Sequence, residues 1–199
     1  MIKPKEASVH VPPVEKCLQI MDVHGMIPNI RRHSLMVARV AAVMGEALNR
    51  KGSRLDIGLI VAGALLHDIA KGVTLREGGN HVEMGRRIVA EMGYPEVARV
   101  VGGHVDVGPE LSNSIDEATV VNYADKRVQH DRLVPLKERM RDLERRYGRT
   151  RKKRVLLREM ARNIERLESH LFSQIRRSPE ELERMIWSAP RLIGQKTRV

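Results

Sequence analysis

The stretch LLHDIAKG, residues 65–72, sets a histidine, an aspartate and a lysine directly behind an apolar run, Ile57–Leu66. Burying ionisable groups at the end of a core helix costs on the order of several kcal/mol unless a partner compensates. His67 and Asp68 are adjacent, about 100° apart around a helix, so one ion can contact both only from a position between their directions. The stretch therefore indicates a helix that surfaces here or a metal site.

His33 and Asp125 are candidates for the remaining ligands of such a site. Side chains three or four residues apart share a helix face, and neither residue has a charged neighbour at those spacings. A half-buried carboxylate then needs a cation from elsewhere in the fold, which is a metal ion or an arginine on another helix. Imidazole and carboxylate ligands suit Fe, Mn, Zn or Ni better than Mg, and spacing does not choose among the four.

Two more histidines stand where a helix end could aim them inwards, His81 after the predicted cap Asn80 and His104 after a Gly-Gly pair. Six ligands exceed what one ion takes if water and substrate also bind. Two ions bridged by Asp68 would use all six, and ions about 4 Å apart can clamp a phosphoryl group and activate a water. The alternatives are a solvated His81 and a His104 that complements a helix dipole.

Apolar periodicity predicts an all-α protein in which helices position these residues, with no strand. The first predicted helix begins near Asn29 and ends by Gly52, and the second begins at Asp56 and carries His67 and Asp68. A third runs from Asn80 to Gly93, a fourth begins at Pro95, and a fifth begins at a capping box of Ser114 and Glu117. Residues 71–80 are predicted to form a loop. Small residues such as Gly58 and Gly63 predict that the helix after Asp56 is central and closely packed.

Beyond Pro135 the sequence changes character, because heptad-like apolar stripes run along very basic helices. We divide the chain into an N-terminal segment, 1–28, a core, 29–135, and a basic helical extension, 136–199. Residues 126–177 hold 18 Lys and Arg against 7 Asp and Glu, an excess of +11 that equals the net charge of the chain. Such a block attracts phosphate by its field, and a solvated helical face is the alternative.

The composition bounds the setting of the protein. A lone cysteine, Cys17, excludes an internal disulfide framework and fits a reducing compartment. The longest apolar run has ten residues, too few to cross a bilayer, and the N-terminus has no apolar signal region. We expect a cytoplasmic protein without a membrane partner.

Five motifs in order, RRHSLMVARVA, LLHDIAKG, HVEMG, GGHVD and NYADKRV, resemble the HD-domain superfamily of metal-dependent phosphohydrolases. They span residues 31–128, and their order is similar to that of members with two metals. The resemblance implies a five-helix core in which His33, His67, Asp68 and Asp125 are the shared metal set and His81 and His104 hold a second ion. The motif reads HDIAK where many relatives have HDIGK, and no GYP signature of cyclic-di-nucleotide hydrolases is present.

The resemblance also implies catalytic roles for Asp68 and Lys71. Lys71 matches the family's lysine that follows HD and would hold a substrate phosphate; an ion pair with Asp68 or a dipole partner is the alternative. Arg127 lies next to a ligand in sequence and is a candidate for binding phosphate, with a solvated arginine as its alternative.

The implied activity is hydrolysis of a phosphoester or phosphoanhydride, usually in a nucleotide. The motif progression is similar to that of small dinucleoside-polyphosphate hydrolases, so a nucleotidase or such a hydrolase is expected, with cyclic-nucleotide phosphodiesterase as the alternative enzyme. A low-turnover nucleotide- or nucleic-acid-binding regulator is the alternative of another class. The stripes from Leu157 to Leu171 predict packing on the core or a homodimer; nucleic acid is a less favoured partner because aromatic residues for stacking are nearly absent.

Overall fold

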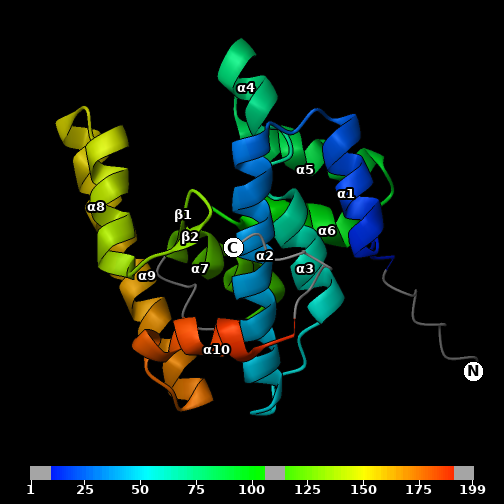
Figure 1. The fold of residues 1–199 in the computed structure, drawn as a ribbon. Helices are drawn as coiled ribbons and strands as arrows, with labels where there is room; N and C mark the ends of the chain where they lie inside the picture. The colour runs from blue at the N-terminus through cyan, green and yellow to red at the C-terminus, as the bar shows by residue number, and fades with distance from the viewer. Residues whose placement is uncertain (1–9, 106–114, 191–199) are drawn as a thin grey trace, which may run out of the picture.

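The computed structural model describes residues 10–105 and 115–190, which form helices joined by short connections (Figure 1). The prediction of an all-α fold is confirmed. The elements are α1 Val14–Val23, α2 Pro28–Asn49, α3 Ile57–Leu66, α4 Lys71–Glu77, α5 His81–Glu91, α6 Pro95–Gly103, α7 Glu117–Arg127, β1 Val128–Gln129, β2 Arg132–Leu133, α8 Leu136–Tyr147, α9 Arg151–Ile175, a 3-10 turn Pro179–Glu181 and α10 Leu182–Ser188.

Helix α3 lies at the centre of the core, as its small residues predict, and packs against α1, α2, α6 and α7. Its N-terminus is capped by Asp56, whose side chain accepts from the backbone N–H of Leu59. A Cβ on Gly63 would lie 2.3 Å from Val100 Cγ1, so only glycine allows α3 and α6 to approach this closely. The stretch Ile57–Glu77 is long and apolar enough for a membrane span, but 67% of it is buried inside the protein, which fits the core helix of a soluble domain.

The chain around the HD motif differs from the prediction. We expected one helix to carry His67 and Asp68, but α3 ends at Leu66, and Ile69 N–H and Lys71 N–H close tight turns onto Leu66 O and Asp68 O. Residues 71–80, predicted to form a loop, contain α4, which ends only at Gly78 and Gly79, both with positive φ. The turns let two adjacent side chains leave the helix direction and enter the same site.

Three smaller corrections concern the ends of elements. The N-terminal segment contains a helix, α1, which packs on α3. Helix α7 is capped by Asp116, whose side chain accepts from Thr119 N–H, while the predicted cap Ser114 lies outside the described residues. The prediction of no strand is wrong at β1 and β2, a hairpin of two-residue strands that is too short to show an alternating pattern.

The basic extension forms one flank of the molecule, and α10 lies against α2 (Figure 1). Helix α9 contacts α8, α7 and α2. Its buried side chains are Ile164, Leu167, Leu171, Phe172 and Ile175. The C-terminal part of the predicted stripe therefore packs on the core, whereas Val155 and Leu156 near the start of α9 are each 55% exposed.

Candidate metal centre

Six side chains from five parts of the fold meet at one place. His33 comes from α2, His67 and Asp68 from the turn after α3, His81 from the start of α5, His104 from the end of α6 and Asp125 from α7. All are buried except His81, whose side chain is 31% exposed. The structure thus brings together every ligand that the sequence predicts, from positions up to 92 residues apart in the chain.

The histidine rings are packed against one another in a row. Ring centroids lie 5.4 Å apart for His33 and His67, 4.9 Å for His67 and His104, and 5.9 Å for His104 and His81. Asp68 lies within the row, with Oδ2 3.4 Å from His67 Nε2 and Oδ1 3.5 Å from His81 Nε2. The two oxygens of one carboxylate therefore face different histidines.

Backbone carbonyls fix the orientation of three of these rings. The Nδ1 of His67 lies 2.7 Å from Ala64 O, that of His104 lies 2.6 Å from Val101 O, and that of His33 lies 2.8 Å from His130 O. When Nδ1–H donates to a carbonyl, the Nε2 lone pair is left for another partner. This hydrogen bond is the usual support of a metal-ligating histidine, and here all three Nε2 atoms face the cluster.

Asp68 and Asp125 stay ionised in the cluster. Burial works to raise the pKa of each carboxyl, but His67 and Lys71 outweigh it at Asp68, and Lys126 and His33 outweigh it at Asp125, so both pKa values lie well below the usual range. A pair of ionised buried carboxylates calls for positive charge.

The histidines respond to that charge in opposite ways. Burial would lower the pKa of His67, but Asp68 and Asp125 raise it above its ordinary value. Burial, together with the charge on His67, lowers the pKa of His104 to about 3 and keeps it neutral, which is the form that binds a metal. A divalent ion beside His67 Nε2 would supply the positive charge that the carboxylates draw there.

Two buried atoms in the cluster show that the residues fit a metal ion. His67 Nε2 and Asp68 Oδ1 have no hydrogen-bond partner within the described part of the chain. Such atoms are costly to bury unless a ligand takes them. Donor atoms lie within 4.8 Å of one another in two groups, His33–His67–Asp68 and Asp68–His81–His104, which share Asp68. Both groups contain Asp68, so each could hold a metal ion that contacts this carboxylate.

Asp125 belongs to neither of these groups. Its Oδ1 lies 2.9 Å from His33 Nε2 and 3.8 Å from His67 Nε2, so it contacts two of the ligands directly. Its Oδ2 accepts from Lys126 Nζ at 2.6 Å. The arginine partner considered from the sequence is therefore replaced by histidines and a lysine.

Lysines stand on two sides of the cluster. Lys71 is the first residue of α4 and donates from Nζ to Asp68 Oδ2 at 2.7 Å, with 34% of its side chain exposed. Lys126 is buried and also donates to His104 O at 3.4 Å. Lys126 was not predicted from the sequence as part of the cluster. Its position beside Asp125 was the available signal, but a lysine next to an aspartate is common on solvated helices.

The structure places Arg127 away from the cluster. Its guanidinium is buried, donates to Val134 O and Tyr123 Oη, and pairs with Glu168 Oε1 of α9 at 2.7 Å. Arg127 follows Asp125 by two residues, which turns its side chain about 200° around the helix. Its observed role is to join α7 to the extension, so the structure does not support its assignment to phosphate binding.

Comparison with known proteins agrees with this geometry. The HD domain family matches residues 30–128. An uncharacterized protein of Methanocaldococcus jannaschii is 26% identical over 153 residues, covering 68% of this chain and 89% of that protein. No solved structure is a significant match.

Several relatives are named Ribonuclease Y. Those of Thermus thermophilus and Syntrophomonas wolfei are each 37% identical, over 39% and 49% of this chain. The matched part is only 13% and 18% of those two proteins, so the similarity concerns one domain of a longer chain. With the motifs, the gathered ligands and the family match in agreement, the chain belongs, through residues 30–128, to the HD-domain family of metal-dependent phosphohydrolases.

Proposed function

We propose that the protein is a phosphohydrolase with two divalent transition-metal ions that cleaves a phosphoester or phosphoanhydride bond of a nucleotide. One observation carries the proposal: two donor groups share the buried carboxylate of Asp68, and its Oδ1 has no hydrogen-bond partner within the described residues. A pair of ions held this way would lower the pKa of a bound water and hold a phosphate oxygen.

The residues of the chain have distinct tasks in this proposal. Asp68 holds both ions, while His33, His67 and Asp125 serve one and His81 and His104 serve the other. Lys71 is a partly exposed cation at the edge of the cluster, paired with Asp68. In this proposal its ammonium leaves Asp68 and binds a substrate phosphate instead. Charge on the phosphoryl oxygens in the transition state is then stabilised by a fixed cation.

A second candidate function is hydrolysis of a phosphodiester in RNA. The partial similarity to Ribonuclease Y and the basic flank formed by α8 and α9 favour it. The small-nucleotide proposal stands ahead because aromatic platforms for bases are scarce and because most of the inward face of α9 is packed on the core. A homodimer through α8 and α9 remains a prediction.

A substrate screen with a metal assay tests the proposal. The protein, supplied in turn with Mn²⁺, Fe²⁺, Zn²⁺ or Ni²⁺, would be incubated with nucleoside monophosphates, dinucleoside polyphosphates, cyclic nucleotides and a short RNA. We expect release of phosphate or nucleotide from the first two classes and its loss in Asp68→Ala. Cleavage of RNA alone would favour the second candidate, and no turnover with any metal would favour the regulator.

Lys71→Met tests the role of the lysine within the same screen. The variant keeps the length of the side chain and removes its charge. We expect unchanged metal content with kcat/KM lower by about 100-fold, because the cation is lost from the transition state. An unchanged kcat/KM would make Lys71 a structural partner of Asp68.

A further inference from the structure

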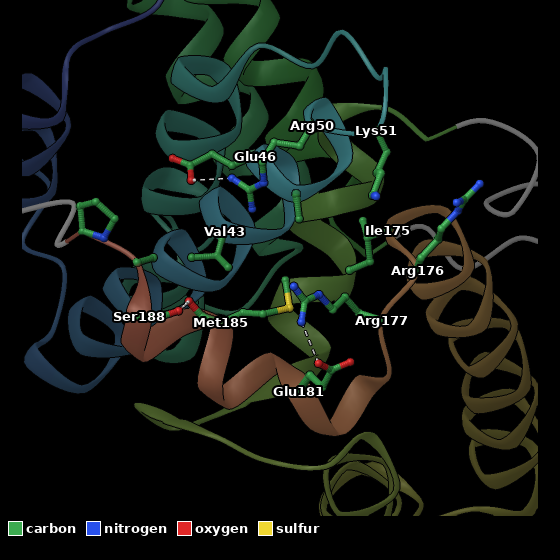
Figure 2. A pocket seen from close by; sticks show the side chains of 13 residues that line it. Val43, Glu46, Arg50, Lys51, Ile175, Arg176, Arg177, Glu181, Met185 and Ser188 are labelled. Carbon is green, nitrogen blue, oxygen red and sulfur yellow. Dashed lines mark hydrogen bonds and ion pairs between the residues drawn. The ribbon is translucent and has the colours of Figure 1, made fainter.

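One cavity is lined by residues that do not belong to the metal cluster. It measures about 800 Å³ and opens between the C-terminal end of α2, the end of α9 and α10 (Figure 2). His33 lies near the start of α2, and the residues of α2 that line the cavity begin at Val43, so the cavity starts about 15 Å along the helix from the cluster. This volume is in the range of sites for small ligands.

The cavity has a mainly polar lining with a cationic rim. Val43, Ala47, Ile175 and Met185 contribute aliphatic groups, of which Val43, Ala47 and Ile175 are almost fully buried. Among the described residues, the rim carries four cations, Arg50, Lys51, Arg176 and Arg177, against two carboxylates, Glu46 and Glu181. The site therefore offers a net positive charge for an anion.

Pairing within the rim leaves two of the cations free. Arg50 pairs with Glu46 at 3.9 Å, and Arg177 pairs with Glu181 at 2.9 Å, as the dashed lines of Figure 2 show. The side chains of Lys51 and Arg176 have no ion-pair or hydrogen-bond partner within the described residues. Both carboxylates of the rim are occupied, so an anion from outside is the partner that these two cations lack.

Arg176 is also held in an unfavourable backbone conformation. It caps α9 with φ 54° and ψ 50°, the left-handed region that glycine or asparagine adopts at lowest cost. A glycine at this position would end the helix without backbone strain. The arginine adds strain, and its side chain forms no hydrogen bond or ion pair within the described residues. Strain of this kind at a cavity rim points to a function for the side chain.

We propose that this cavity binds a phosphorylated small molecule of the size of a nucleoside monophosphate. Lys51 and Arg176 hold the phosphate, and the space between α2 and α10 receives the rest of the molecule. The site is separate from the metal cluster and needs no metal ion. The competing account, cations that only complement the dipoles of α2 and α9, predicts no ligand and a loss of stability when Arg176 is removed.

The chain carries its own reporter for this site. Trp187, the one tryptophan, stacks on Arg39 of α2 with 4.6 Å from the guanidinium carbon to the ring centroid. It lies in α10 between the cavity-lining residues Met185 and Ser188. Its fluorescence should therefore respond to a ligand that draws α10 and α2 together.

The test titrates the full-length, metal-loaded protein with the methylene phosphonate analogue of AMP, which a phosphohydrolase cannot cleave at the replaced ester bond. Inorganic phosphate and adenosine are the part-ligands. We expect a saturable change in Trp187 fluorescence with the analogue, binding weaker by about tenfold or more with either part, and no dependence of the signal on Lys71→Met. Failure of the cluster to hydrolyse nucleotides would leave this result unaffected.

Arg176→Gly separates ligand binding from stability. The glycine relieves the backbone strain while it removes the charge, so we expect an equal or higher melting temperature together with at least about tenfold weaker binding of the analogue. Arg162→Ala, which removes an exposed arginine of α9 outside the cavity, is the charge-matched control and should bind normally. A lower melting temperature in Arg176→Gly with unchanged fluorescence titration, or equal weakening in both variants, would overturn the proposal.

Discussion

The HD core and the basic extension use charge in opposite ways. In the core, charged groups are less dense than in the extension, and most of those at the metal cluster are buried, with Asp68 only 1% exposed. In the extension most charges lie on the surface, as in α8 and α9, and the buried side chains are apolar except for Asp142 of α8. The core thus buries its charged groups at one site, whereas the extension is a charged layer. The extension packs on the core along the buried face of α9, which we call the seam.

A buried polar group adds to the contacts that join the two regions. Arg127 and Tyr123 of α7 meet Glu168 of α9, with Tyr123 Oη donating to Glu168 Oε1 at 2.7 Å. Burial raises the pKa of the Tyr123 hydroxyl well above its ordinary value, so the group stays a donor. Substitutions at the core site should therefore abolish activity, whereas substitutions at the seam should first lower the free energy of unfolding.

The largest expected effect is on catalysis. His67→Ala should reduce hydrolysis to background, because it removes the ligand whose Nε2 has no hydrogen-bond partner within the described residues. The quantity measured is the turnover rate of the best substrate from the screen, and circular dichroism verifies that each variant is folded. His170→Ala on α9 is the matched control and should keep full rate; equal loss in both variants would refute the assignment.

The next effect is on stability at the seam. Leu167→Ala should lower the free energy of unfolding by about 2–5 kcal/mol, because the fully buried side chain leaves a cavity between α9 and the core. Leu156→Ala, on the exposed side of the same helix, should change it by less than about 0.5 kcal/mol. Urea unfolding measures both, and equal effects would mean that α9 does not depend on packing against the core.

A smaller loss is expected when the ionic link is broken. Glu168→Gln should cost about 1–3 kcal/mol, since Arg127 is then buried without a countercharge. Adding Arg127→Met should recover part of that loss by removing the unpaired charge. If the double variant is as unstable as the sum of the single variants, the three groups do not act as a unit.

The smallest expected effect concerns Cys17 in α1, which is fully buried. Burial raises the pKa of its thiol to about 12, so the folded protein holds almost no thiolate at pH 9. Alkylation of the native protein should therefore be far slower than that of the unfolded chain at both pH 7 and pH 9, because the unfolded thiol, with a pKa of about 8.5, is largely thiolate at pH 9. The buried neutral thiol makes its full contribution to the free energy of unfolding below about pH 8.5, and that contribution falls as the pH rises towards 12. Rapid labelling of the native protein would contradict the packing of α1.

The sequence predicted the ligands of the cluster better than the backbone that carries them. Residue types and motif order identified His33 and Asp125 although 92 residues separate them. The turns at 67–70 and helix α4 were missed, because they depend on tertiary contacts and short apolar runs carry no such signal.

Arg127 and Lys126 show the limit for charged residues. They follow Asp125 by two residues and by one, yet Lys126 lies at the cluster and Arg127 contacts Glu168 of α9. Which way each side chain points depends on the rotation of α7 against its neighbours, and a single sequence does not give that rotation. Arg176 shows the same limit, since its left-handed backbone appears only in the fold.

The measurement that tests the central claim most directly is the number of metal ions per chain in three proteins. The account predicts up to two in the unchanged protein, about half as much in His104→Ala, and none in Asp68→Ala, because only Asp68 belongs to both donor groups. Full metal content in Asp68→Ala would contradict a shared carboxylate, and equal content in all three proteins would contradict the metal centre itself.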